Sequence, residues 1–434
     1  MKRKTMTIIL ALCGLVVATG FAQVPTTATD TPDTPLPPPV TTASGADART
    51  GFHYGALTIT PELDLSVFYD SNPTYTGGST GSNRSSRSVI GFKMQPMLDF
   101  VLNGGSWIAN ARAWMTHDYY PGNIDPTYRD TIEKNHYGES IGVNWTTPHD
   151  THYSLTEFFE YQQRNDPVWA PSSGGTGGGP GGTVNNSWGD RYSFAVGSAM
   201  DTRLSEKSSM NLGVSFSDVW YSNPALYGWQ DLGGTLGFRR QLTARTDLLL
   251  DFGTDAQWSD GSAGRSQSYR ALVGLGTQPD AISTYRISAG FMGYDFNNGS
   301  NTAYAMTYSV SGNWRLSQRL SATLNGSANF QPSETSQNSY TIVDTLAGGL
   351  NYLVSSRLTT SAGVVLRHEA WANRDPLYAQ QRRDNELDIY TRANYQFHRY
   401  ASVFVGADIS GDASTLSPAT YNRLFLEAGV KLRF

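Results

Sequence analysis

Polar and apolar residues alternate one by one along many stretches of about 10–16 residues, and this pattern constrains the fold more than any other feature. Successive side chains of a β-strand point to opposite faces, so each stretch predicts a strand with one apolar and one polar face. One pattern break is Glu139, which falls on the apolar side of its stretch. The first stretch sets Thr58, Thr60, Glu62, Asp64 and Ser66 against Leu57, Ile59, Leu63, Leu65, Val67 and Tyr69.

About eighteen such stretches occur, an even number typical of bacterial outer-membrane barrels. Turns of two or three residues, such as 103–105, alternate with longer connections, such as 121–134. The sequence therefore predicts an all-β fold over residues 52–434: a single closed antiparallel transmembrane β-barrel of about 18 strands (16–18), with short periplasmic turns and longer extracellular loops. The expected strand starts are 55, 87, 106, 135, 151, 189, 207, 229, 245, 265, 282, 301, 318, 338, 356, 384, 400 and 419.

The N-terminus predicts export from the cytoplasm. Three basic residues at positions 2–4 precede an apolar run over residues 8–17, and Gly20 and Ala22 supply the small residues of a cleavage site. This order is typical of a secretory signal peptide, assigned to residues 1–22. The apolar run is shorter than the roughly 20 residues that span a membrane. Together with the barrel pattern, the signal predicts localisation in the outer membrane of a Gram-negative cell.

Residues 23–51 are rich in Pro, Thr and Asp and contain no pattern that could bury a core. Such a segment is expected to be disordered, and it could serve as a plain tether or as a docking arm. The only cysteine, Cys13, lies within the predicted signal peptide. Cleavage after Ala22 would therefore leave a mature chain that cannot form a disulfide.

Aromatic residues gather near the ends of the predicted strands. Amphipathic rings at these depths are typical of the two interfacial girdles of an outer-membrane barrel. A β-sandwich would place its aromatic residues in the middle of strands, so the distribution favours the barrel. The residues assigned to the girdles are Tyr119, Tyr120, Tyr161, Trp220, Tyr221, Trp229, Trp258, Tyr294, Trp314, Tyr352, Trp371, Tyr400 and Tyr421.

The last strand ends the chain on an aromatic residue, Phe434. Pairing of this strand with the first would close the barrel and leave no free edge. An aromatic last residue on an amphipathic strand resembles the C-terminal signal that the barrel-assembly machinery recognises in bacterial outer-membrane proteins. Phe434 is accordingly the predicted assembly signal.

Residues 59–76 resemble the opening strand of the β-barrel porin-2 family. In that family a strand containing proline, here Pro61, runs into a Tyr-Asp-Ser-Asn loop, here Tyr69, Asp70, Ser71 and Asn72. The resemblance implies a secreted, mostly β protein of similar length. It brings no catalytic residues.

Residue patterns for enzymatic chemistry are missing from the sequence. No Gly-x-Ser-x-Gly nucleophile elbow at a strand-to-helix junction is predicted and there is no phosphate-binding loop, and the adjacent His117 and Asp118 would face opposite sides of a strand. The net charge of −5 gives no support for nucleic-acid binding. We therefore expect no enzyme, no catalytic or metal residues and no cofactor. The seven histidines without metal spacing are His53, His117, His136, His149, His152, His368 and His398.

Charged residues on the polar faces predict a water-filled lumen, because Arg or Lys against lipid at mid-depth costs about 2–4 kcal/mol. Each could instead be a wall residue paired across neighbouring strands. Residues 165–188 form the longest connection and could constrict the lumen or lie on the surface. The predicted pore-lining residues are Lys93, Asp99, Arg112, Glu160, Arg239, Asp251, Arg286, Arg367, Arg392 and Glu427.

Two functions are compatible with this reading. The first is a passive porin-like channel for small hydrophilic solutes or ions, since barrels of 16–18 strands leave an aqueous channel. The second is a non-conducting or partner-dependent barrel, for surface anchoring or for export of envelope polysaccharide or protein. The expected partners are outer-membrane lipid and, during biogenesis, the barrel-assembly machinery. A homo-oligomer is compatible with either function, and nucleic acid is not an expected partner.

Overall fold

The computed structural model describes residues 51–72, 88–121, 135–164, 189–222, 228–259, 265–280, 282–296, 301–332, 340–374, 381–415 and 420–434. Nineteen β-strands run through these residues. None of the described residues forms a helix long and apolar enough to cross a membrane. The strands are β1 Phe52–Tyr54, β2 Leu57–Asp70, β3 Val89–Asn103, β4 Trp107–Tyr119, β5 Asn135–Thr146, β6 His152–Arg164, β7 Gly189–Ser205, β8 Ser208–Tyr221, β9 Trp229–Thr243, β10 Thr246–Ser259, β11 Arg265–Asp280, β12 Ser283–Phe296, β13 Asn301–Arg315, β14 Leu320–Pro332, β15 Tyr340–Leu353, β16 Leu358–Arg374, β17 Gln381–His398, β18 Ala401–Ser414 and β19 Tyr421–Arg433.

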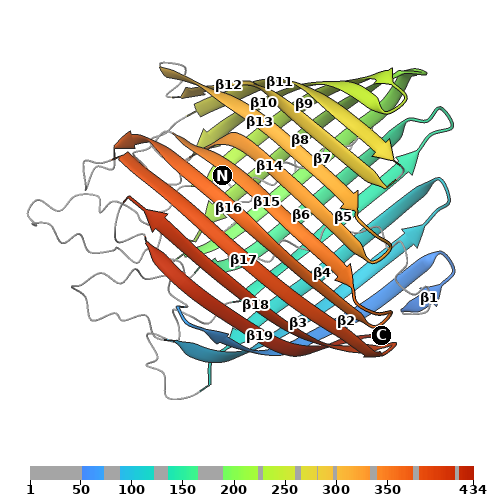
Figure 1. The fold of residues 1–434 in the computed structure, drawn as a ribbon, viewed down its shortest axis with the longest axis vertical. Helices are drawn as coiled ribbons and strands as arrows, with labels where there is room; N and C mark the ends of the chain where they lie inside the picture. Colours follow the sequence, from blue (N-terminus) through green and yellow to red (C-terminus); the bar gives the residue numbers. More distant parts are fainter. Residues whose placement is uncertain are drawn as a thin grey trace, which may run out of the picture.

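Strands β2 to β19 pair antiparallel in chain order, and β19 then pairs with β2. The pairing closes an eighteen-strand barrel whose strands cross its wall obliquely (Figure 1). The predicted fold class is therefore confirmed. Each of the eighteen strands begins within three residues of its expected start, and the largest difference is at β17, which begins at Gln381. A closed barrel satisfies the backbone groups of its strands internally, as a lipid environment requires.

Strand β1 was not expected from the sequence. It pairs with Leu57–Ile59 of β2, on the stretch of that strand that lies beyond the pairing with β19, which covers Glu62–Asp70. The tight turn between β1 and β2 contains Gly55 at φ +62°, a left-handed conformation that favours glycine. β1 thus gives β2 a pairing partner on the residues that β19 does not reach.

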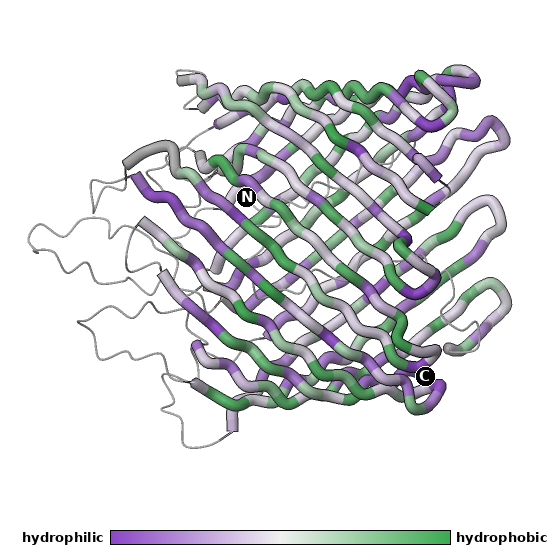
Figure 2. Tube along the Cα trace, viewed as in Figure 1, coloured by the Kyte–Doolittle hydropathy of each residue, from purple (hydrophilic) through white to green (hydrophobic). Residues whose placement is uncertain are grey.

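The two faces of the barrel wall differ in chemistry and in exposure. On β2, Phe68 and Asp70 are 2% exposed, whereas Leu65 and Val67, which alternate with them, are 43% and 45% exposed. Hydrophilic and hydrophobic residues alternate along the strands (Figure 2). The concave face is thus polar and shielded by the wall, and the convex face carries the exposed apolar side chains that lipid would cover.

Two neighbouring carboxylates break this rule on the outer face of β5 and β6. Glu139 on β5 lies opposite Phe159 of β6, and Glu157 lies opposite Ile141, so the two acids are diagonal neighbours across one strand pair. Both positions lie away from the strand ends, among outward Phe159, Ile141 and Val196 of β7. The break seen in the sequence at Glu139 is therefore real and involves a second residue.

Outward aromatic residues form stacked rows near both ends of the strands. Near the longer loops, Tyr137 stacks on Tyr161 at 4.6 Å between ring centroids, and Tyr192 stacks on Trp220 at 5.3 Å. Near the short turns, Trp145 stacks on Tyr153 at 5.0 Å. These rows agree with interfacial girdles.

Several aromatic residues assigned to the girdles lie on the inner face instead. Tyr120, Trp229 and Tyr294 are 2%, 7% and 5% exposed, and the register places Tyr421 and Tyr221 on the inner face as well. Proximity to a strand end does not determine which face a ring occupies, so this part of the girdle prediction was wrong. The side chain of Trp371 lies outside the described residues.

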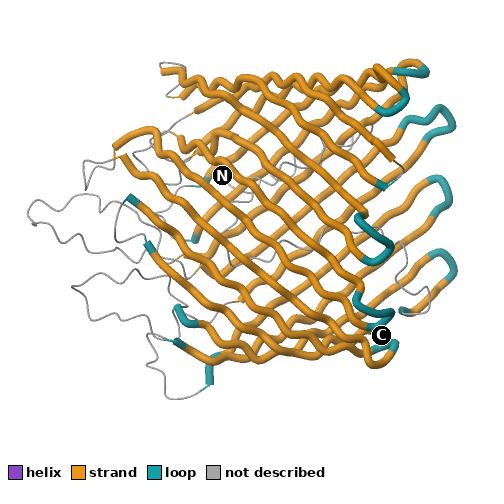
Figure 3. The backbone as a smooth tube through the Cα atoms, viewed as in Figure 1, coloured by secondary structure: helices purple, strands orange, loops and turns teal. Residues whose placement is uncertain are grey.

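The short turns gather at one end of the barrel, where the C-terminus also lies (Figure 3). The backbone N–H groups of four turns bond to a hydroxyl two residues earlier, on Ser205, Thr243, Ser317 or Ser355. Residues 1–50, which hold the predicted signal peptide and nearly all of the predicted disordered segment, lie outside the described residues.

Candidate functional site

All ten predicted pore-lining residues occupy inward positions in the strand register. Lys93 and Asp99 lie opposite inward Ser66 and Thr60 of β2, and the alternation carries this face around the barrel. Their role as a pore lining remains a prediction. The positions lie on β3 (Lys93, Asp99), β4 (Arg112), β6 (Glu160), β9 (Arg239), β10 (Asp251), β12 (Arg286), β16 (Arg367), β17 (Arg392) and β19 (Glu427).

The structure pairs several of these residues across neighbouring strands. Arg112 donates from Nε to Asp99 Oδ1 at 2.5 Å and from Nη2 to Oδ2 at 3.2 Å, a two-point contact. Lys93 Nζ lies 4.0 Å from Glu427 Oε1. Glu160 Oε1 lies 2.7 Å from His136 Nε2.

The remaining predicted residues have different environments. Arg239 Nη2 lies 2.6 Å from Asp247 Oδ2. The Arg392 guanidinium stacks over the Phe404 ring, 4.2 Å from its centroid. Asp251 and Arg286 lie on β10 and β12, which are separated by β11.

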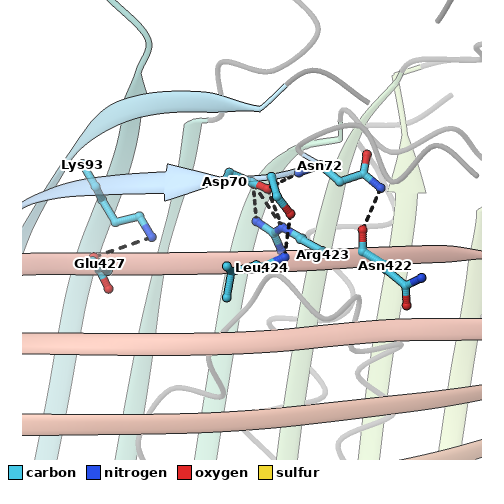
Figure 4. A network of polar contacts seen from close by, with 8 residues as sticks. Asp70, Asn72, Lys93, Asn422, Arg423, Leu424 and Glu427 are labelled. Carbon is cyan, nitrogen blue, oxygen red and sulfur yellow. Dashed lines mark hydrogen bonds and ion pairs between the residues drawn. The ribbon is translucent and has the colours of Figure 1, made fainter. Parts of the chain in front are cut away.

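The seam between β2 and β19 carries the most buried ion pair that the described residues form on the inner face (Figure 4). Arg423 donates from Nη2 to Asp70 Oδ2 at 2.7 Å and from Nε to Oδ1 at 3.0 Å. The side chains are 9% and 2% exposed. A charge-assisted, two-point bond at such burial fixes the relative position of the two strands.

The next two residues of the Tyr69–Asn72 motif extend this contact. Ser71 Oγ accepts the N–H of Leu424 at 2.7 Å, and the Ser71 N–H donates to Leu424 O at 3.0 Å. Asn72 donates from Nδ2 to the carbonyl oxygen of Asn422 at 3.1 Å, and its own N–H bonds to Asp70 Oδ1 at 2.9 Å. The motif that suggested a family resemblance therefore closes the barrel at the end of β2.

An aromatic cluster packs on the inner face below this contact. The rings of Phe68 and Phe425 stack at 5.3 Å, and Tyr120 meets Phe68 edge-on at 5.5 Å. Lys93 Nζ lies 5.0 Å from the centroid of the Phe425 ring. Lys93 therefore sits between Glu427 and the aromatic cluster at the seam.

Carboxylates predominate on the inner face of β16–β18 beside the seam. We call this surface the acidic wall: Glu369, Asp384, Glu386, Asp388, Asp408 and Asp412. Arg367 lies 2.5 Å from Glu369 and 3.9 Å from Glu386, and Arg382 lies 2.7 Å from Asp384. The acids outnumber these arginines, so the surface retains negative charge.

Two members of the acidic wall have unsatisfied oxygens. Asp388 Oδ1 and Asp412 Oδ1 are buried and have no hydrogen-bond partner among the described residues. Asp412 is 9% exposed. Within the sequence, Asp388 follows Glu386 and Asp384 at two-residue spacing, a signal that would have revealed the wall. The sequence prediction included only Arg367 and Arg392 from β16–β18.

The inner face also bounds a cavity at the turn end of the barrel. Its volume is about 730 Å³, and its lining includes Asn313, Asn351, Arg392, Phe404 and Lys431. Lys431 is held by Glu62 at 2.5 Å and by Asp64 at 3.2 Å. The cavity can hold water and small polar solutes.

No group of three or more His, Cys, Asp or Glu side chains within the described ranges is placed to hold a metal ion. Residues 165–188, which could constrict the lumen or lie on the surface, lie outside the described residues.

Comparisons with known proteins give similarities of shape at very low identity. No family model matches the chain, and no curated protein matches it. Among solved structures, the FrpB iron transporter from Neisseria meningitidis (TM-score 0.44, 8% identity) covers 86% of this chain and 81% of its own. The ferric-catecholate import receptor Fiu from E. coli K12 has a TM-score of 0.42 and 9% identity, and the match covers 89% of this chain and 82% of the receptor. The copper transporter OprC has a TM-score of 0.45 and 10% identity, and the match covers 89% of this chain and 82% of the transporter. TM-scores below 0.5 are too low to support a functional conclusion.

Proposed function

We propose that this outer-membrane barrel is a passive porin-like channel for small hydrophilic solutes. The observation that carries the proposal is the inner face, which is polar on strand after strand and places charged residues from β3 to β19 toward the lumen. Barrels of 16–18 strands enclose enough space for an aqueous channel. Charged side chains on such a face are solvated by lumenal water rather than buried in lipid.

The resemblance of residues 59–76 to the β-barrel porin-2 family agrees with this proposal. The contacts of Asp70, Ser71 and Asn72 with β19 give that motif a structural role in barrel closure. Membership of the family remains part of the proposal.

The second candidate is a non-conducting or partner-dependent barrel, used for surface anchoring or for envelope export. The predicted disordered segment at residues 24–50 favours it, because a plain porin does not need such a segment. These residues lie outside the described residues. The two candidates differ in one measurable property, which is the conductance of the isolated protein.

Single-channel recording in a planar lipid bilayer tests the proposal. The purified mature protein, checked for heat-modifiable gel mobility, should insert in discrete current steps that are present at low voltage. A correctly assembled barrel that carries no current would contradict the passive-channel proposal and favour the partner-dependent alternative.

A further inference from the structure

Four turns at the short-turn end share an apolar residue, a hydroxyl, a variable residue and a cation. They connect β7–β8, β9–β10, β13–β14 and β15–β16. In each turn the backbone N–H of the cationic residue bonds to the hydroxyl oxygen, at distances from 3.1 to 3.4 Å. The four turns are 204–207 (Leu-Ser-Glu-Lys), 242–245 (Leu-Thr-Ala-Arg), 316–319 (Leu-Ser-Gln-Arg) and 354–357 (Val-Ser-Ser-Arg).

The apolar residue is an exposed leucine in three of the four turns, and in the fourth it is the half-buried Val354. Leu204 and Leu242 lie two residues after outward Thr202 and Arg240, at a bulge at the end of β7 and of β9, and both are 55% exposed. Leu316 is 60% exposed and follows outward Trp314 by two residues. These side chains therefore extend the lipid-facing surface to the rim of the barrel.

The cationic residue comes three positions after the apolar one and is exposed in every case: Lys207, Arg245, Arg319 and Arg357. An apolar side chain in the hydrocarbon edge places a cation at this spacing near the phosphate level of the lipid headgroups. The hydroxyl bond fixes the backbone of the cation in each turn. The Arg319 side chain also donates from Nη1 to the carbonyl oxygen of Val354 at 3.5 Å.

We propose that these four turns form a periplasmic lipid-binding rim whose cations bind the phosphates of anionic phospholipids. The variable third position carries Glu206, Ala244, Gln318 or Ser356 and has no shared chemistry at the turn tips. A protein partner docking on the tips would contact those residues, whereas a lipid contacts the shared apolar and cationic residues. The turns at 103–106, 147–151 and 280–283 contain no lysine or arginine, so the four cations occupy only part of the circumference.

The test measures headgroup preference near Trp314, which lies two residues before Leu316 on the outward face. The mature protein is reconstituted in phosphatidylcholine vesicles with and without phosphatidylglycerol. Quenching of Trp fluorescence by brominated phosphatidylglycerol is compared with quenching by brominated phosphatidylcholine. A Trp314→Phe variant identifies the contribution of this tryptophan.

We expect the wild type to prefer phosphatidylglycerol, and the variant K207Q/R245Q/R319Q/R357Q to lose about fivefold of that preference, since one cation near an anionic surface contributes about that factor. The charge-conserving variant K207R/R245K/R319K/R357K should retain the preference. High salt should weaken the wild-type preference. Arg265→Gln removes an exposed cation at the opposite rim, beside Trp258, and should change nothing at Trp314.

An unchanged preference in the neutral variant would overturn the proposal, provided that the variant shows native heat-modifiable mobility. An equal loss in the charge-conserving variant would also overturn it, because the proposal rests on charge. If the quadruple neutral variant does not assemble, Arg319→Gln, in the turn that follows Trp314, is measured alone and must lower the preference.

Discussion

The contact between Asp70 and Arg423 joins residues that are 353 positions apart in the chain. Both side chains are almost fully buried. Burial makes each charge dependent on the other, because removal of one partner leaves an uncompensated charge in a site of low polarity. This pair therefore contributes to barrel closure in a way that an exposed surface pair does not.

We predict that Asp70→Asn lowers the free energy of unfolding by about 3–5 kcal/mol, the usual cost of breaking a buried pair. The double variant Asp70→Asn/Arg423→Met should recover part of the loss, because no unpaired cation remains. Urea unfolding in lipid vesicles measures both. Asp99→Asn is the matched control, since its pair with Arg112 is more exposed, at 21% and 26%, and should cost about 1 kcal/mol or less. A double variant less stable than Asp70→Asn would contradict this account.

On the outer face, removal of a charged residue should raise the free energy of unfolding rather than lower it. Glu139 and Glu157 lie among lipid-facing apolar residues, and their diagonal arrangement adds like-charge repulsion. Glu157→Leu and Glu139→Leu should each raise the free energy of unfolding by about 1 kcal/mol, because carboxylates on the lipid face cost less than the 2–4 kcal/mol of Arg or Lys.

The same urea assay tests the outer-face variants. Glu160→Leu serves as the matched control on β6. Its carboxylate faces inward and contacts His136, so its replacement should destabilise the barrel. Loss of stability in all three variants would show that the outward acids are held by favourable contacts rather than tolerated in lipid.

Strand β19 closes the barrel by pairing with β2, and Phe434 follows its last residue. The N–H of Phe434 donates to Pro61 O at 3.0 Å, while its ring is 51% exposed on the outer face. The backbone bond does not depend on the side chain, so the exposed ring is free to act during assembly.

We predict that deletion of Phe434 lowers the yield of assembled barrel in the outer membrane far more than deletion of Val24–Thr50. Phe434→Tyr should assemble normally, because it retains an aromatic ring, and Phe434→Ala should resemble the deletion. Heat-modifiable gel mobility of membrane fractions gives the assembled fraction. Equal yields from the two deletions would show that the terminal residue is not the assembly signal.

Strand positions were predictable from the sequence because a period of two can be read without knowing which strands are neighbours. The same period placed Lys93, Arg112 and Glu160 on the inner face. Pairing was not predictable, because it depends on the offset between neighbouring strands. Arg112 bonds to Asp99 and Glu160 to His136 for this reason.

Aromatic residues at strand ends show a second limit of prediction from the sequence. Tyr120 and Trp229 sit where a strand meets a connection, and there the alternation is too short to define a face. The structure places both inside the wall, Tyr120 against Phe68. β1 was missed because three residues are too few to establish a period.

Across the whole molecule, charge is distributed unevenly along the barrel. The acidic wall lies toward the longer loops, and the cations of the lipid-binding rim lie at the short turns. Within the acidic wall, Arg367 and Arg382 offset only part of the negative charge. A solute that crosses the lumen beside β16–β18 therefore meets a negative surface.

The final prediction follows from this surface and from the proposed channel. Lining charges set the ion preference of a pore, so the wild-type channel should favour K⁺ over Cl⁻. Asp388→Asn/Asp412→Asn should lower the ratio of K⁺ to Cl⁻ permeability, because it removes two carboxylates whose Oδ1 atoms have no hydrogen-bond partner among the described residues. The reversal potential in a KCl gradient across a planar bilayer measures this ratio.

Glu139→Gln is the control, because it removes a charge from the outer face and should leave the permeability ratio unchanged. An anion preference in the wild type, or a shift no larger in the double variant than in Glu139→Gln, would show that the acidic wall does not face the conducting path.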